Sequence, residues 1–459
     1  MTWSCCERDE VRNDNAIIWV SIFIVVASLA TLYFFEFELQ DIIIAVLAFV
    51  LITKIGRGMT KDADRSWMGW VIPLAFMVKL IGATFRHYTV TVVYNSGDAL
   101  TYYGFAENAI HAWRSLELPI SEGRSQGTRF IEVLTSLVFA PYFPTILGGF
   151  IMFATIAFMG QMLFYATFRR AMPHRRLKAY GLSMFFLPSL FFWPSSIGKE
   201  SVLMFFIGLT VYGATLMYEG KWLASMPLVA AGMILTAAVR PHVAALLAGA
   251  LVLSLIFGRM PKIRGGTVAR FLLIAVAMAS LFAAASAVTA RFGVGLNAEE
   301  VQEFTDQVEG QTEQGGSSFD AETVTSPTQL PAATLRVLFR PLIHEAHNLQ
   351  AQLSSVESTI LLAMTLIALP RIVRNIRMVR MYPYLAFSLF FTGGFVIAFS
   401  SIGNAGILSR QRVQVIPFFL VLFFGLTVNR RALVEDGETG LERQEPEPPK
   451  PPILVGPYR

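Results

Sequence analysis

Hydrophobic residues are grouped along this chain in long blocks that short polar loops separate. A helix that crosses a bilayer needs about 20 predominantly apolar residues. Twelve blocks approach or reach that length, namely residues 16–35, 42–53, 67–84, 146–168, 180–193, 202–217, 222–239, 243–257, 271–288, 357–369, 382–400 and 415–428. The pattern therefore predicts an all-α, polytopic integral membrane protein with twelve transmembrane helices.

The loops between these blocks differ in charge. Lys and Arg are concentrated in every second loop, at residues 54–65, 169–178, 259–270, 371–380 and 429–431. Cytoplasmic loops of membrane proteins carry an excess of these residues. The alternation therefore predicts a multi-pass protein of a bacterial inner (plasma) membrane, with both termini in the cytoplasm.

The same alternation predicts three regions. Residues 1–15 form a polar cytoplasmic tail, and residues 429–459, which contain the run EPEPPKPP, form a disordered cytoplasmic tail. Residues 16–428 form a single transmembrane domain, with long outer loops at residues 86–145 and 289–355.

Two segments of the first outer loop are expected to be helical without crossing the membrane. Residues 98–113 place apolar side chains on one helical face, and this predicts an amphipathic helix in the outer interface. The members of that face are Tyr102, Ala106, Ala109, Ile110 and Trp113. Residues 129–140 are apolar over only about half a span. A full span there would place the next basic loop outside, so an interfacial or re-entrant segment is predicted.

Composition agrees with a membrane protein and excludes several other classes. The chain has 459 residues, of which 54% are hydrophobic and 15% charged, against about 25% charged in soluble domains. The net charge of +5 arises from the basic loops, so no nucleic-acid partner is predicted. The chain has no P-loop, dinucleotide fingerprint, HExxH motif or nucleophile elbow. These absences argue against ATP-driven transport by this chain and against a zinc protease.

Charged residues at the predicted outer ends of the spans are the candidate site. They are Asp98, Glu107, Lys199, Glu200, Arg240, His242, Arg410 and Arg412. Cations are unfavourable on the side opposite the basic loops unless an anion stabilises them. Arginine offers a planar fork for phosphate oxygens and lysine a point charge. The set therefore predicts recognition of a phosphate or pyrophosphate.

Structural roles for these residues stay open. Lys199 and Glu200 can form an internal ion pair, and Arg410 and Arg412 can pair with Glu200 or Glu107. Residues two apart diverge on a helix but share a side of an extended backbone. The run SSIGNAGILSR before the two arginines favours an irregular backbone that lets both face one ligand.

Two roles are also open for Asp98. It follows Ser96 and Gly97 at the start of the predicted amphipathic helix, so its side chain can cap that helix. Alternatively, it acts as a general base on an acceptor hydroxyl, or binds a divalent cation that bridges to a phosphate. Glu107 lies nine residues further on, nearly on the opposite face, and is a poor direct partner.

Four motifs carry a resemblance to a known group of proteins: SGDALTYYGFAENA, PSLFFWPSSIGKES, VRPH and GNAGILSRQRVQVIPF. The chain resembles bacterial polytopic membrane proteins of polysaccharide assembly, the GT-C type glycosyltransferases and O-antigen-polymerase-like proteins. The resemblance implies a polyprenyl-phosphate-linked sugar donor at the outer face of the inner membrane. It assigns Asp98 the role of base or metal ligand, and Arg240, Arg410 and Arg412 that of outer arginines. Many members have a paired Asp/Glu where this chain has one acid.

The function predicted from these observations is glycosyl transfer or polymerisation in cell-envelope or exopolysaccharide assembly, with a saccharide or lipid acceptor. A transporter or flippase of an anionic lipid-linked saccharide is the main alternative. A structural subunit that binds other envelope-assembly proteins is another. The middle of each span is almost wholly apolar. A flippase needs a polar path through the membrane, so this pattern favours the enzyme.

Overall fold

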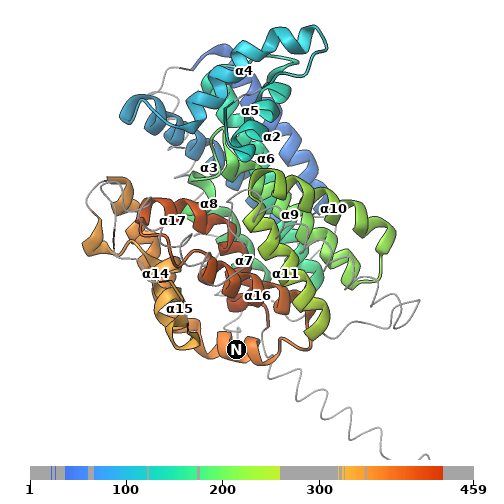
Figure 1. Cartoon of the computed structure of the whole chain (residues 1–459), viewed down its shortest axis with the longest axis vertical. Helices are drawn as coiled ribbons and strands as arrows, with labels where there is room; N and C mark the ends of the chain where they lie inside the picture. The colour runs from blue at the N-terminus through green and yellow to red at the C-terminus, as the bar shows by residue number, and fades with distance from the viewer. Residues whose placement is uncertain are drawn as a thin grey trace, which may run out of the picture.

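The computed structural model describes residues 37–59, 67–120, 123–172, 176–258, 326–346 and 349–426, together with a few single positions. This part of the chain is helical and contains no β-strand (Figure 1). Its α-helices are α2 (Leu39–Met59), α3 (Met68–Tyr88), α4 (Asp98–Arg114), α5 (Gln126–Phe139), α6 (Ile146–Ala171), α7 (Leu177–Phe186), α8 (Pro188–Phe192), α9 (Lys199–Tyr218), α10 (Trp222–Val239), α11 (Pro241–Phe257), α14 (Leu330–Phe339), α15 (Leu349–Arg377), α16 (Pro383–Ala398), α17 (Ala405–Gln411) and α18 (Ile416–Phe424). A π-helical turn, η2 (Thr89–Val93), continues α3, and a 3₁₀ turn, η5 (Arg412–Gln414), follows α17.

Within the described residues, six helices are long and apolar enough to cross a membrane. They are Leu39–Met59, Met68–Val93, Ile146–Ala171, Lys199–Tyr218, Trp222–Val239 and Ser354–Arg377. A seventh candidate is the bent pair Ala405–Gln414 and Ile416–Phe424, whose halves meet at 62°. The helical, membrane-type architecture predicted from the sequence is thus seen. The number of twelve spans stays a prediction, and the expected spans at 16–35 and 271–288 lie outside the described residues apart from Ile22 and Val26.

One expected span, residues 180–193, is broken into two helices. α7 ends at Phe186, and Leu187 has the extended angles φ −64° and ψ 128°. Pro188 explains the break, because proline disfavours helical angles at the preceding residue and has no N–H to continue the helix. α8 then runs for five residues, to the turn that leads into α9.

Buried polar side chains satisfy the backbone at this break. The Glu357 carboxylate of α15 accepts from the Ser189 backbone N–H and from its hydroxyl, both at 2.7 Å. On the other side, Lys79 Nζ and Gln161 Nε2 donate to the Leu190 carbonyl, at 2.9 and 3.2 Å. Lys79 is fully buried in α3. Mid-span positions, expected to be almost wholly apolar, thus include a few polar side chains that serve as partners for the broken helix.

The predicted amphipathic helix is α4. Its buried positions include Tyr102, Ala106 and Ala109 of the expected apolar face. Trp113 Nε1 donates to Ser136 Oγ on α5 at 2.9 Å, and this bond ties the two helices together. α5 has 14 residues, about 21 Å at 1.5 Å per residue, and so is too short to span a bilayer. α4 and α5 lie together at the top of Figure 1.

The ends of the helices fall into two groups. At one end, Arg170 of α6 pairs with Glu219 after α9 at 2.5 Å. There too, the Arg176 N–H donates to the Phe424 carbonyl and Arg374 Nη2 to the Leu426 carbonyl, at 3.1 and 2.7 Å. These contacts gather the described basic loops at one end of the bundle, as the sequence pattern requires. Which side of a membrane this end faces stays a prediction.

Three central helices approach each other closely through glycines. A Cβ on Gly160 of α6 would collide with the Met204 carbonyl of α9. A Cβ on Gly232 of α10 would collide with Thr210 Oγ1 of α9 and lie 2.8 Å from the Phe206 carbonyl. Small residues permit such close backbone contact between membrane helices. The position of α9, which begins at Lys199 and Glu200, therefore depends on these glycines.

We expect Gly160→Ala to lower stability, because the added methyl group must push α6 away from the Met204 carbonyl. Overpacking of this kind costs about 1–3 kcal/mol. The control is Gly393→Ala in α16, where a Cβ meets nothing within 4 Å. Thermal unfolding in detergent should show a lower midpoint for Gly160→Ala only. Equal midpoints for the two variants would contradict the close helix contact.

Candidate functional site

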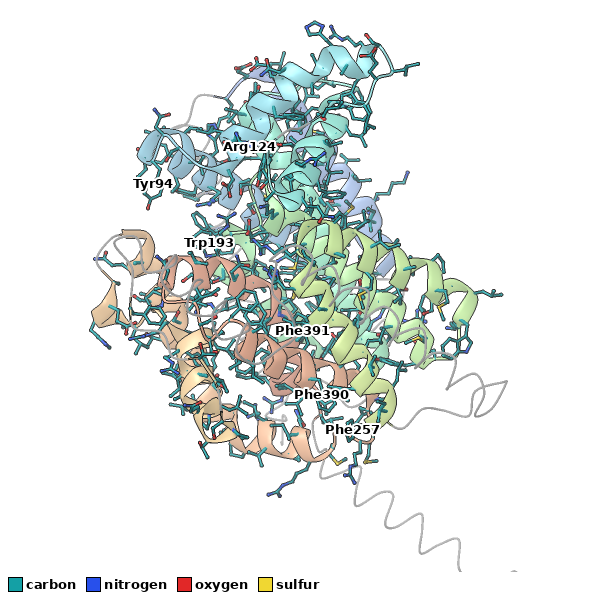
Figure 2. All side chains as sticks on the ribbon, viewed as in Figure 1. Tyr94, Arg124, Trp193, Phe257, Phe390 and Phe391 are labelled. Carbon is teal, nitrogen blue, oxygen red and sulfur yellow. The ribbon has the colours of Figure 1, made fainter. Side chains whose placement is uncertain are left out.

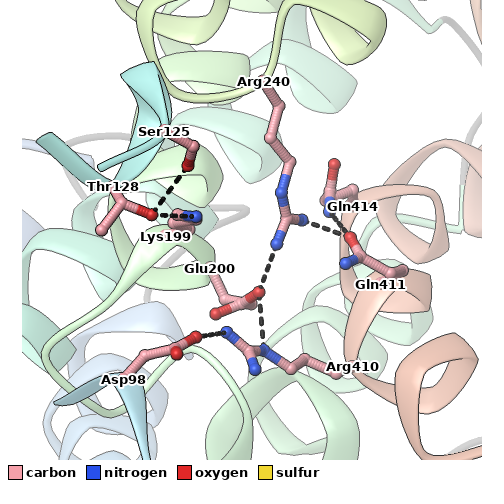
Figure 3. Close-up of polar contacts among 9 residues, drawn as sticks. All are labelled: Asp98, Ser125, Thr128, Lys199, Glu200, Arg240, Arg410, Gln411 and Gln414. Carbon is pink, nitrogen blue, oxygen red and sulfur yellow. Dashed lines mark hydrogen bonds and ion pairs between the residues drawn. The ribbon is translucent and has the colours of Figure 1, made fainter. Parts of the chain in front are cut away.

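Charged side chains from four segments meet at the end of the bundle opposite the basic loops (Figure 3). Asp98 opens α4, Glu200 lies in the first turn of α9, Arg240 separates α10 from α11, and Arg410 belongs to α17. These four residues are called the charged cluster here. All four were predicted from the sequence as site residues.

Glu200 lies at the centre of the charged cluster. It is only 3% exposed, and its Oε1 accepts from Arg240 Nη2 at 2.7 Å and from Arg410 Nε at 2.8 Å. Arg410 Nη2 also lies 3.2 Å from Asp98 Oδ2. Arg240 Nη1 donates in addition to Gln411 Oε1. One buried carboxylate thus holds two guanidinium groups, and one of these groups reaches a second carboxylate.

Local backbone structure brings these side chains together. Glu200 lies at the N-terminal end of α9, where the helix dipole favours a negative charge. Arg240 has the extended angles φ −144° and ψ 92°, as expected for a residue before proline. Asn404 caps α17 by accepting from the N–H groups of Gly406 and Ile407 at 3.0 and 3.1 Å. The cap starts the short helix that carries Arg410.

Burial changes the pKa of two groups at the charged cluster. It lowers the pKa of the Arg240 guanidinium, while the Glu200 carboxylate opposes that shift. Arginine has the highest ordinary pKa of the protein side chains, so the group stays charged at neutral pH. Burial also raises the pKa of the Tyr102 phenol, and the nearby Asp98 and Glu200 carboxylates raise it further. Tyr102 is therefore neutral at neutral pH.

A cavity of about 310 Å³ opens beside the charged cluster and is called the site cavity here. It lies between the connection from α3 to α4, the turn before α9, and α17. Its lining includes three members of the cluster, Asp98, Glu200 and Arg410, and further side chains from Arg86, Tyr94, Trp193 and Asn404. Figure 2 shows Tyr94 and Trp193 on the same side of the molecule, at the level between α4 and α17.

The chain turns sharply along one wall of this cavity. α3 ends in the π-helical turn η2, and such turns are frequent at functional sites. Gly97 then has φ +138°, a conformation that a side chain would disfavour. This turn returns the chain so that Asp98, 57% exposed, faces Arg410.

Asp98 does not cap α4. The N-cap residue is Gly97, and Asp98 is the first helical residue. Its carboxylate pairs with Arg410 instead of accepting the backbone N–H groups of its own helix. The capping interpretation of Asp98 was therefore wrong. Its exposed carboxylate is available at the site cavity.

Lys199 and Glu200 do not form the internal ion pair that the sequence left open. Lys199 Nζ donates to Thr128 Oγ1 of α5 at 3.1 Å, while Glu200 pairs with Arg240 and Arg410. The difference arises because adjacent residues in the first turn of α9 point in different directions. Lys199 lies near the charged cluster but does not line the site cavity.

Glu107 and His242 are also absent from the lining of the site cavity. Glu107 is exposed on α4, far round the helix from Asp98 as the nine-residue spacing requires. The His242 ring packs at 5.9 Å from the Phe399 ring. The structure therefore does not bring these two residues to the cavity.

Arg412 is directed away from Arg410 into the protein. It is 1% exposed, and its Nη1 donates to the Leu338 carbonyl, the Arg340 carbonyl and Ser358 Oγ, at 2.9, 3.2 and 2.8 Å. The backbone from α17 into η5 is helical rather than extended. The expectation that Arg410 and Arg412 share a side was wrong for this reason. Arg412 connects η5 to α14 and α15.

Sequence reasoning did not assign Arg86 or Gln411 to the site. Arg86 was visible only as a cation at the far end of a span, a position that interfacial arginines commonly occupy. Gln411 carries no charge and lies between two arginines, which are more evident candidates for an anion site. The structure places Arg86 at the site cavity and Gln411 on Arg240.

The described residues do not provide an evident metal site. They contain no group of three or more His, Cys, Asp or Glu side chains that could hold an ion. The two carboxylates at the site cavity, Asp98 and Glu200, are both paired with Arg410. This donor set suits guanidinium groups better than the divalent cation that the sequence left open.

Comparison of the chain with protein-family models, with curated proteins and with solved structures found no match. The resemblance to GT-C type and polymerase-like proteins therefore stays a prediction.

We expect Glu200→Ala to destabilise the protein strongly, because two guanidinium groups would then face each other without their shared carboxylate. Removing one partner of a buried ion pair costs about 3–5 kcal/mol. Unfolding by SDS titration in mixed micelles should report this loss as a lower midpoint.

Glu219→Ala at the opposite end is the matched control. Its ion pairs with Arg170 and Lys221 are partly exposed to solvent, and such pairs contribute about 0–1 kcal/mol. If Glu200→Ala unfolded at the same SDS fraction as Glu219→Ala, the central role of Glu200 would be wrong.

Proposed function

We propose that this protein is a membrane glycosyltransferase or polymerase. It uses a polyprenyl-(pyro)phosphate-linked sugar at the outer face of a bacterial inner membrane, in cell-envelope or exopolysaccharide assembly. The observation that carries the proposal is one cavity with an exposed carboxylate and guanidinium groups, at the end of the bundle opposite the basic loops. By the positive-inside rule, that end faces away from the cytoplasm.

The charge balance favours an anionic ligand. The lining of the site cavity contains two cations, Arg86 and Arg410, and two carboxylates, Asp98 and Glu200. Lys199 and Arg240 lie next to these residues outside the lining, and they bring the formal charge of the region to +2. A surplus of this sign in a partly buried cavity attracts an anion, and guanidinium groups match phosphate oxygens. A phosphate linked to a lipid supplies the missing negative charge.

The chemistry of transfer needs a base and an anion site close together. The acceptor hydroxyl oxygen attacks the anomeric carbon of the donor sugar, and the bond from that carbon to the phosphate oxygen breaks. The electron pair of the broken bond stays on the phosphate, where the arginines stabilise the negative charge. The hydroxyl proton passes to the Asp98 carboxylate, which is 57% exposed at the cavity.

The buried polar side chains support an enzyme rather than a flippase. Lys79, Gln161 and Glu357 each bond to the backbone at the break between α7 and α8. Each of these three side chains is thus engaged with backbone groups inside the protein. A cavity at one end suits chemistry at one membrane face.

The experiment is sugar transfer by the purified protein in lipid nanodiscs, from a defined polyprenyl-phosphate-linked sugar to an added acceptor. We expect Asp98→Asn to lower the transfer rate by about 10²- to 10⁴-fold, because the amide cannot accept the hydroxyl proton. Glu117→Gln makes the same chemical change at an exposed position after α4. It should leave the rate unchanged.

An unchanged rate for Asp98→Asn would refute the role of this residue as base. The variant Arg240→Ala is a second test of the site, because it removes a guanidinium group that pairs with Glu200 in the charged cluster. If both variants transferred sugar as the wild type does, the assignment of the site would be wrong.

A further inference from the structure

Arg86 is the cation of the site cavity that has no anionic partner in the described structure. It lies near the end of α3, three residues before η2 begins. Its Nε is buried without a hydrogen-bond partner, and no ion pair joins it to a described carboxylate. The guanidinium carbon lies 4.9 Å from the Trp193 ring centroid and 5.4 Å from that of Phe192.

The other guanidinium groups are already engaged. Arg240 bonds to Glu200 and Gln411, and it does not line the site cavity. Arg410 contacts both Glu200 and Asp98. Most of their positive charge is thus balanced by the protein itself, which leaves Arg86 with the least balanced charge at the cavity.

Aromatic rings hold Arg86 without neutralising it. A ring face attracts a guanidinium group but carries no net charge and accepts no strong hydrogen bond. The terminal nitrogens of Arg86 donate no hydrogen bond to a described residue, so their N–H groups remain available to a ligand. This arrangement positions a cation for an incoming anion.

We propose that Arg86 is the residue that binds the phosphate group of the ligand directly, with Arg240 as a positioning residue behind Glu200. This inference rests on the proposed function and names the binding residue of the same site. The cavity of about 310 Å³ is at the small end of ligand sites, which span about 300–1,000 Å³. It therefore encloses a phosphate and a sugar of small size rather than a long saccharide.

The test measures binding and does not depend on sugar transfer. Farnesyl phosphate, a short polyprenyl phosphate, is titrated into the purified protein in nanodiscs by isothermal calorimetry, with farnesol and inorganic phosphate as separate probes. Arg86→Gln should weaken farnesyl phosphate binding on the order of tenfold to a hundredfold, the effect of losing charged hydrogen bonds. Its binding of farnesol should stay the same.

Two further variants keep the test decisive. Arg114→Gln removes an exposed arginine from α4 and should change affinity less than about twofold, since an exposed charge is screened by salt. Arg86→Lys keeps the charge but loses the fork, so its affinity should fall between those of the wild type and Arg86→Gln. The thermal midpoint of Arg86→Gln should fall only slightly, because the contacts with the Trp193 and Phe192 rings are lost but no hydrogen bond to a described residue is. Arg86→Lys serves for the comparison if Arg86→Gln does not fold.

The outcomes separate the inference from the proposed function. Binding of farnesyl phosphate that depends on Arg86, without sugar transfer, supports the phosphate site and refutes the enzyme. Equal, Arg86-dependent binding of inorganic phosphate supports the site and identifies free phosphate as the source of the ligand. Binding that is the same in Arg86→Gln and the wild type overturns the inference, whether or not the protein transfers sugar.

Discussion

The buried carboxylate of Glu200, shared between Arg240 and Arg410, is the interaction on which the site depends. Two guanidinium groups cannot remain close in a buried place without a shared anion. By satisfying this requirement, Glu200 fixes the distances between α9, the α10–α11 junction and α17. The second carboxylate, Asp98, lies in the wall of the site cavity, whose remaining cation, Arg86, lies against the Trp193 ring without an ion pair to a described carboxylate.

A second constraint holds the elements around that cluster. The proline break between α7 and α8 exposes backbone groups inside the bundle, and Lys79 and Glu357 bond to them from α3 and α15. The same α3 carries Arg86, and the same α8 precedes the turn into α9. Buried polar groups that a membrane protein could not otherwise tolerate thus tie together the helices that surround the site cavity.

Periodicity and charge predicted the parts of the fold that depend on local sequence. The limits of α10 and the buried face of α4 agree with the sequence pattern. The alternation of basic loops with loops poor in Lys and Arg predicted one shared end for Asp98, Glu200, Arg240 and Arg410. The structure brings these four residues together. The Arg412 side chain points away from Arg410 because the backbone after Ala405 is helical. The role of Arg86 depends on its contact with a ring from another segment. Neither tertiary feature can be seen in one sequence.

The most direct test of the account is an experimental structure of the protein in a lipid nanodisc with farnesyl phosphate at saturating concentration. The account predicts phosphate density within hydrogen-bonding distance of the Arg86 guanidinium, beside Asp98, with Glu200 still between Arg240 and Arg410. It also predicts that this density lies at the end of the bundle opposite the basic loops. Phosphate density at the basic end, or a site cavity that stays free of phosphate under these conditions, would contradict it.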